Sequence, residues 1–227
     1  MWLCLGIRIA TRLTIRRLLW LGTLALMAMP AMGIEEPAFK RIGQSGRVEL
    51  RDYSTYLVAE TRVQADFAEA GNLAFRPLFS YISGNNRRQE KIEMTAPVSQ
   101  STERGAGEKI DMTAPVTQLA SSPGSYVIGF VMPARYTRES IPQPLDERVS
   151  IRQIPSRSMA VLTCTGTWSE ARYAGHEKEL TAEIAKAGWR ARGAIEFARY
   201  DPPFMPWFLR RNEVMVEVES SSVERNP

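Results

Sequence analysis

Alternating apolar and polar residues predict strands in both halves of the chain. The alternation occurs in residues 48–53, 56–63, 126–132, 149–154, 159–165, 194–200 and 213–218. A period of two residues gives a strand one apolar and one polar face. Residues 66–83 and 169–187 instead repeat their apolar positions at helical spacing and are followed by Gly84 and Gly188. Pro77 lies inside the first helical pattern, so we expect a kink there or the start of a second short helix.

One octapeptide is written twice in this chain. KIEMTAPV occupies residues 91–98, and KIDMTAPV occupies residues 109–116. Both copies alternate with a period of two, and their apolar positions are Ile92, Met94, Ala96 and Val98 in the first and Ile110, Met112, Ala114 and Val116 in the second. The ten residues between them are rich in Ser, Gly and charge, as in an exposed loop. The repeat therefore predicts a hairpin with both apolar faces on one side, and with Pro97 and Pro115 at strand ends or on an edge.

The order of the predicted elements is similar in the two halves of the chain: strands, one helix, then two strands. That order favours an α+β domain built from two similar halves, in which antiparallel strands curl around a core and one helix per half covers it. A chain of 227 residues with 44% hydrophobic residues is long enough for one such core. We place this domain at residues 34–220 and expect residues 221–227 to be a disordered tail.

Residues 1–33 have the pattern of an export signal. Arg8, Arg12, Arg16 and Arg17 precede an apolar run that ends at Met29, and small residues follow at Ala31 and Gly33. This pattern predicts a signal peptide that is cleaved before Ile34, which would make the mature protein periplasmic. The alternative is an uncleaved membrane anchor formed by residues 18–34. The arginine pair resembles a twin-arginine signal only weakly, so the export route stays open.

Charge and cysteine content argue against nucleic-acid binding and against a disulfide-stabilised domain. The chain has 29 Lys and Arg against 25 Asp and Glu, and the first 33 residues hold four of the arginines, so residues 34–227 carry equal numbers of both signs. Such a neutral domain lacks the basic excess expected of a nucleic-acid-binding protein. Cys164 is the only cysteine after residue 33, so this part of the chain cannot form an internal disulfide.

Residues for acid–base or metal chemistry are scarce. His176 is the only histidine in the chain, and its position at the margin of a helical apolar stripe favours a partly buried or surface role. The sequence contains no Cys/His cluster for zinc and no phosphate-binding glycine loop between a strand and a helix. Cys164 falls among alternating apolar residues, which favours a small buried side chain over a metal ligand. These features predict a binding protein and not an enzyme.

An aromatic segment near the C-terminus is a candidate binding element. The run YDPPFMPWFLRRNEV contains Phe204, Trp207 and Phe208, and prolines at 202, 203 and 206 stiffen it before Arg210 and Arg211. The segment could plug one end of the barrel. It could equally form an aromatic wall beside two arginines, which suits a flat apolar ligand that carries carboxylates.

Several motifs, in the same order along the chain, resemble the SOUL haem-binding protein family. They are LFSYISGNN, KIEMTAPV, FVMP and YDPPFMPWFLRRNEV, and the resemblance spans nearly all of residues 36–218. It implies two pseudo-symmetric halves that form a distorted eight-stranded antiparallel β-barrel flanked by two helices. That fold is similar to the effector-binding domains of some bacterial regulators. The resemblance also implies binding of haem or a related tetrapyrrole as a cofactor or ligand, without established catalysis for most members.

The resemblance suggests a site without a dedicated histidine. Some family members have been proposed to use an axial histidine in the first half of the chain, and here that half has none. Haem would then be ligated by Met94, Met112, Cys164 or a tyrosine, or held only by apolar contacts. We expect Phe204 and Trp207 to line the macrocycle and Arg210 and Arg211 to bind its propionates.

The predicted function is therefore non-catalytic tetrapyrrole binding by a carrier, buffer or sensor. One alternative is a module that binds another small apolar ligand or effector and never binds haem. Another is a hydrolase that uses carboxylates such as Asp201 or Glu213.

Overall fold

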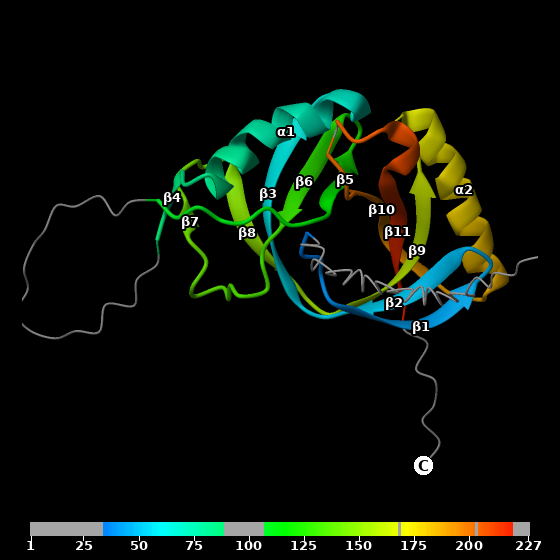
Figure 1. Cartoon of the computed structure of the whole chain (residues 1–227). Coiled ribbons are helices and arrows are strands. Elements are labelled where there is room, and N and C mark those ends of the chain that lie inside the picture. Colours follow the sequence, from blue (N-terminus) through cyan, green and yellow to red (C-terminus); the bar gives the residue numbers. More distant parts are fainter. Residues whose placement is uncertain (1–33, 89–106, 168, 203, 220–227) are drawn as a thin grey trace, which may run out of the picture. The chain divides into compact units, whose positions relative to one another are not determined.

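The computed structural model describes residues 34–88, 107–167, 169–202 and 204–219. Their elements, in chain order, are β1 (Phe39–Ser45), β2 (Val48–Tyr53), β3 (Tyr56–Gln64), α1 (Phe67–Ile82), β4 (Asn86–Arg87), β5 (Val116–Ser122), β6 (Ser125–Val131), β7 (Gln143–Pro144), β8 (Val149–Ile154), β9 (Arg157–Thr165), α2 (Glu170–Lys186), β10 (Ala191–Arg199), the 3-10 turn η1 (Trp207–Leu209) and β11 (Arg211–Val218). Nine of the described strands form one curled antiparallel sheet, and α1 and α2 pack against it (Figure 1). β4 and β7 form a separate two-stranded sheet.

The strand order of the large sheet shows the relation between the two halves. The order is β1-β2-β9-β11-β10-β5-β6-β3-β8. Without β1, the order is symmetric about its centre. The strands β2, β3, β5 and β6 of the first half occupy positions equivalent to those of β8, β9, β10 and β11 of the second half, respectively. The predicted α+β fold of two pseudo-symmetric halves is thus confirmed, with β1 as an additional ninth strand on one edge.

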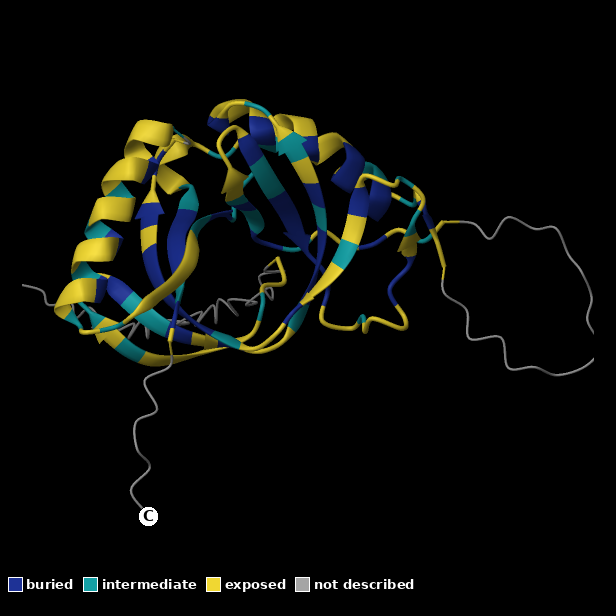
Figure 2. Cartoon of the chain, turned by 180° about the vertical axis from the view of Figure 1, so that it is seen from behind, coloured by how far each residue is buried: buried dark blue, intermediate teal, exposed yellow. Residues whose placement is uncertain are grey.

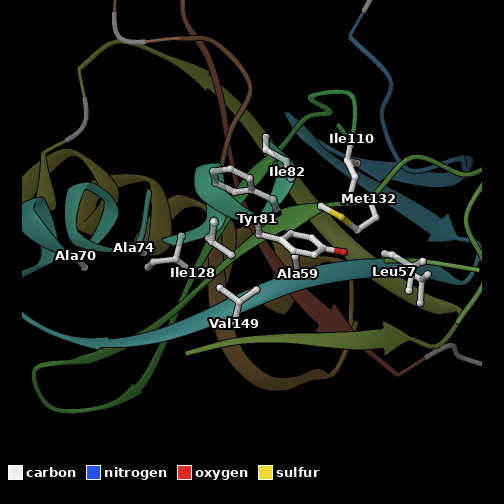
Figure 3. Packing of buried hydrophobic residues seen from close by; sticks show 13 residues of the cluster. Leu57, Ala59, Ala70, Ala74, Tyr81, Ile82, Ile110, Ile128, Met132 and Val149 are labelled. Carbon is white, nitrogen blue, oxygen red and sulfur yellow. The ribbon is translucent and has the colours of Figure 1, made fainter. Parts of the chain in front are cut away.

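Each helix covers an apolar cluster that lies mainly on the strands of its own half, with β8 contributing to the first cluster and β2 to the second. The first cluster joins Ala70, Ala74, Leu78 and Tyr81 of α1 to β3 and β6 through residues such as Ala59 and Ile128 (Figure 3). The second joins Tyr173, Leu180 and Ile184 of α2 to strands such as β9 and β11. Both helices keep an exposed outer face (Figure 2). Pro77 is buried within a continuous α1, so neither a second helix nor a break occurs there.

The octapeptide prediction is wrong where it can be compared. Residues 91–98, with Met94, lie outside the described residues. In the second copy only Val116 belongs to a strand, and residues 109–115 belong to no helix or strand. Their backbone N–H groups bond to separate partners: Ile110 N donates to Ile82 O at 2.7 Å and Ala114 N to Glu35 O at 2.9 Å. Alternation also occurs in segments that pair with no neighbouring strand. The alternating pattern therefore predicted a strand at residues 109–116, whereas β5 begins only at Val116.

Candidate functional site

One hairpin connection differs in length between the two halves. In the first half, β5 and β6 are joined by Pro123 and Gly124 alone. In the second half, the equivalent strands β10 and β11 are joined by residues 200–210, which we call the aromatic loop. Hairpin connections usually have two to five residues, and longer ones are often functional. Since the first half closes the same hairpin with two residues, the fold itself does not require the longer connection.

The aromatic loop exposes large apolar side chains that are normally buried. Phe204 is 85% exposed, and Trp207, Phe208 and Leu209 are 54%, 58% and 60% exposed. The loop is nevertheless ordered by its own contacts: Met205 N donates to Pro202 O at 3.0 Å, and Leu209 N donates to Pro206 O at 2.9 Å. The rings of Trp207 and Phe208 meet edge to face at 5.6 Å. The loop therefore does not plug the barrel, and its apolar side chains face the solvent.

Both arginines that follow the loop have structural partners. Arg210 Nε donates to Met205 O at 2.7 Å and so closes the loop on itself. The guanidinium of Arg211 lies 3.7 Å from the centre of the Tyr200 ring and pairs with Glu36, while its backbone N–H donates to Asp201 Oδ2 at 2.6 Å. Arg211 is thus already engaged by a carboxylate.

A second exposed aromatic surface lies on α1. Arg199, the last residue of β10, packs on the first two turns of α1: its Cζ lies 5.9 Å from the Phe67 ring, and a Cβ on Gly71 would come within 2.6 Å of its Nη1. Phe75 and Phe79 follow Gly71 by one and two helical turns, so they share its side of the helix. Their rings stack at 5.3 Å and 14°, and both are exposed. We call Phe75 and Phe79 the aromatic flank of α1. It lies on the side of the helix that Arg199, the residue just before the aromatic loop, contacts at Gly71.

The helical spacing of apolar residues in 66–83 includes Phe75, so the sequence alone placed Phe75 on the buried side of the helix and missed this flank. The buried stripe actually runs through Ala70, Ala74 and Leu78. Phe79 falls outside that stripe on a helical wheel, and a second phenylalanine one turn from Phe75 was the available signal.

The remaining ligand candidates do not join the aromatic loop. Met112 is exposed. Its neighbour Asp111 accepts from Arg135, in the segment that follows β6, and its neighbour Thr113 donates to the carbonyl of Val131, the last residue of β6. Cys164 is buried among apolar residues near α2, and this burial raises the pKa of its thiol to about 11, which disfavours a thiolate ligand. His176 is on α2, where its Nδ1 lies 3.8 Å from Glu179. Across the described ranges, no group of three or more His, Cys, Asp or Glu side chains could hold a metal ion.

The two carboxylates considered for hydrolysis are part of structural networks. Glu213 is buried on the face of the sheet opposite the helices, where its Oε1 accepts from Arg51 Nη1 at 2.9 Å and its Oε2 from Tyr200 Oη at 2.5 Å. Burial, together with the charge of Glu213, strongly raises the pKa of Tyr200, which keeps this phenol protonated. Asp201 accepts the backbone N–H of Arg211. Both carboxylates therefore hold the base of the aromatic loop.

A cavity of about 550 Å³ is lined by no residue of the aromatic loop, but its lining residue Glu36 pairs with Arg211 at the base of that loop. Its buried lining includes Leu57, Val131, Met132 and Pro133, and its exposed lining includes three carboxylates, Glu35, Glu36 and Glu139, and one guanidinium, Arg138. Residues 35–38 form one wall, and this wall is fixed by bonds from Ala114 N to Glu35 O, from Ala134 N to Glu35 Oε1 and from Ser54 N to Ala38 O. Because Glu36 is paired with Arg211, the other charged groups of the lining are Glu35, Glu139 and Arg138, which offer no excess of positive charge to a dianionic ligand.

The family model for the SOUL haem-binding protein matches residues 34–106 and 100–217 of this chain. The chain belongs to the SOUL family. A human relative, haem-binding protein 2, is 37% identical to this chain over 82 residues. The aligned region covers 34% of this chain and 40% of that protein. The family is one of haem-binding proteins, so the predicted family and the coarse expectation of tetrapyrrole binding are supported.

Solved structures of low sequence identity share the fold of this SOUL protein. The C-terminal domain of EcmrR is 11% identical, with a TM-score of 0.54 over 80% of this chain and 98% of that domain. An uncharacterised conserved protein from Listeria innocua is 11% identical, with a TM-score of 0.50 over 78% and 94% of the two chains. At these identities the likeness concerns the fold alone.

Within the ranges that the structure describes, no helix is long and apolar enough to cross a membrane. The predicted signal segment, residues 1–33, lies outside those ranges.

Proposed function

We propose that this SOUL protein binds haem or a related tetrapyrrole between its aromatic loop and the aromatic flank of α1, as a non-catalytic carrier, buffer or sensor. The observation that carries the proposal is the aromatic loop itself, which exposes four large apolar side chains where the other half of the fold needs only a two-residue turn. A flat macrocycle is a suitable partner for such rings because burying apolar area contributes roughly 25 cal/mol per Å². That gain allows micromolar affinity even after association costs of several kcal/mol.

Charge near the aromatic flank also suits a tetrapyrrole with two propionates. Arg76 is exposed and lies on α1 between Phe75 and Phe79 in sequence. Because Arg211 already pairs with Glu36, we assign a propionate to Arg76 and give Arg210 the role of holding the loop closed. The acidic rim of the cavity lacks this complementarity, which is why we place the tetrapyrrole on the aromatic surface.

The iron should contribute little to binding. Cys164 is buried, and the contacts of Met112 and His176 do not join them to the aromatic loop. Haemin and metal-free protoporphyrin IX should therefore bind with similar affinity, because both offer the same macrocycle and the same propionates.

Titration of residues 34–227 with both ligands, followed by absorbance and by quenching of tryptophan fluorescence, tests this proposal. Trp207→Ala and Phe79→Ala should each weaken both ligands by about tenfold, since each removes a large apolar contact. Leu73→Ala is the matched control, because Leu73 is equally exposed but lies on another side of α1. Tight binding of haemin alone would show that an axial ligand dominates, and binding of neither ligand would refute the proposal.

The cavity favours a second candidate function, the binding of another small apolar ligand or effector. Its volume lies in the range of ligand pockets, and its buried lining is apolar. Ala38→Trp would fill part of the cavity. If this substitution leaves haemin binding unchanged but abolishes binding of a neutral naphthalene probe, the cavity is a separate ligand site.

A further inference from the structure

The tip of the aromatic loop has a charge pattern that a tetrapyrrole site does not require. Residues 202–209 contain no charged side chain, and charges begin at Asp201 and Arg210 on its two sides. Phe204, the most exposed of its apolar residues, lies near the middle of this uncharged run. A tip that is apolar over eight consecutive residues presents a hydrophobic patch of the kind that often marks an interaction site.

The residues around the base of the loop carry both signs of charge. Asn212 Nδ2 donates to Gly166 O at 3.2 Å, and a Cβ on Gly166 would come within 2.5 Å of Arg172 Nη1, so the start of α2 lies beside the loop. The base therefore includes Arg172, Arg210 and Arg211 together with Glu36, Glu170 and Asp201. An apolar tip above a base of balanced charge matches the layers of a zwitterionic lipid surface, in which acyl chains lie below headgroups of both signs.

The composition and stiffness of the tip fit the same surface. Tryptophan and phenylalanine are favoured at membrane interfaces, where amphipathic elements bury their apolar side chains at the boundary between headgroups and acyl chains. Pro202 and Pro206 limit the conformational entropy that the loop would lose on insertion. The internal bonds of the loop hold the tip in one shape before it meets the surface.

We infer that the aromatic loop inserts into the interface of a lipid bilayer and docks this protein reversibly on membranes. Phe204, Trp207, Phe208 and Leu209 enter the boundary of the acyl chains, and the charged base stays among the headgroups. The protein then takes up or releases its ligand at the bilayer, because an apolar macrocycle itself partitions into lipid. This step rests on the proposed tetrapyrrole binding.

Co-sedimentation of ligand-free protein, residues 34–227, with phosphatidylcholine vesicles tests the inference. The wild type should sediment with the vesicles, and the addition of phosphatidylglycerol should change its partition by no more than about twofold, because the base is balanced in charge. Phe204→Ser and Leu209→Ser should each weaken the partition by about tenfold, since each removes one inserted apolar side chain.

Leu73→Ser provides the matched control for Leu209→Ser. The two leucines are similarly exposed, at 54% and 60%, but Leu73 is on α1 and outside the loop. Its replacement should leave the partition unchanged. Equal effects of the two substitutions would overturn the inference, because they would indicate nonspecific adhesion of exposed apolar residues.

Vesicles with brominated acyl chains report the depth of insertion. They should quench the fluorescence of Trp207, and Trp207→Phe should remove that quenching while the protein still sediments. Wild-type protein that stays in the supernatant, or that self-associates through the loop and loses this association in Leu209→Ser, would refute docking on lipid. Haemin titration without vesicles is independent of this result, so a failure of tetrapyrrole binding is distinguished from a failure of membrane docking.

Discussion

At the scale of single residues, the most unusual group is the buried charge network under the aromatic loop. Glu213, Arg51 and Tyr200 meet on the sheet face away from the helices, and Arg51 Nη1 also donates to the Tyr53 hydroxyl at 3.2 Å. A buried charge that loses its partner is costly, because the protein interior solvates it poorly. The network thus couples the stability of the second half to the residue that begins the aromatic loop.

Glu213→Gln should destabilise the protein by about 3 kcal/mol, since it leaves Arg51 with only the partly buried Glu49 as a charged partner. Glu179→Gln is the control, because its pair with Arg47 is largely exposed and contributes less than about 1 kcal/mol. Urea unfolding at neutral pH measures both changes. Equal losses of unfolding free energy in the two variants would contradict a special role for the buried pair.

Stability should also fall at alkaline pH. Burial raises the pKa of Tyr53 to about 12 and raises that of Tyr200 further. Because the folded state holds these protons more tightly than the unfolded chain, the stability that the two phenols contribute is full below pH 10 and is lost as the pH rises above it, by up to about 1.4 kcal/mol per pH unit for each group. Cys164 adds to this loss from about pH 9 upward. Tyr200→Phe should make the decline measured between pH 10 and 12 less steep, and an unchanged slope would show that Tyr200 titrates normally.

At the scale of elements, local patterns predicted the helices well. The expected ranges 66–83 and 169–187 enclose α1 and α2, and Asp66 and Ser169 stand at their N-caps. Helix signals are local, because period, cap and terminating glycine all lie within one segment. β1 and the correct start of β5 escaped prediction. The residues of β1 do not alternate, although its partner β2 follows it directly, and β5 pairs with β10, which lies far along the chain.

The candidate site was predictable only in part, for a similar reason. Composition alone identified Phe204 and Trp207, because aromatic residues between prolines are recognisable in any context. The sequence could not show that Arg211 pairs with Glu36, which lies 175 residues away. Nor could it show that Phe75 leaves the buried stripe of α1, since that depends on how the helix is rotated against the sheet.

Replacement of Pro202–Leu209 by Asn-Gly tests the role of the aromatic loop as an element. The change keeps Tyr200, Asp201 and Arg210 and gives β10 and β11 a shorter connection, similar to the turn between β5 and β6. Since loop length has a small effect on stability, we expect the free energy of unfolding to change by no more than about 1 kcal/mol. Tetrapyrrole binding and vesicle binding should both disappear, and retention of either would place that function outside the loop.

At the scale of the whole domain, the two halves are interlocked. Among the described strands, β2 of the first half pairs with β1 and with β9 of the second half, and β8 of the second half pairs with β3 of the first half alone. A strand of each half is therefore part of the sheet region formed by the other half. A fragment of residues 34–140 should therefore remain unfolded by circular dichroism. Mixing it with residues 141–227 should restore strand content, and independent folding of either fragment would contradict the interlocking.

The interlocked pairing also has a consequence for the time course of folding. β2 cannot find β9 until more than a hundred residues have been synthesised after it, and β11 closes the sheet as the last strand. Proteins dominated by such distant contacts fold slowly, because the entropy of closing long loops is lost before the contacts stabilise the chain. The ribosome would therefore synthesise nearly the whole polypeptide before the complete sheet can form. Until then the nascent chain would stay unfolded, which is the form that can pass through a narrow pore.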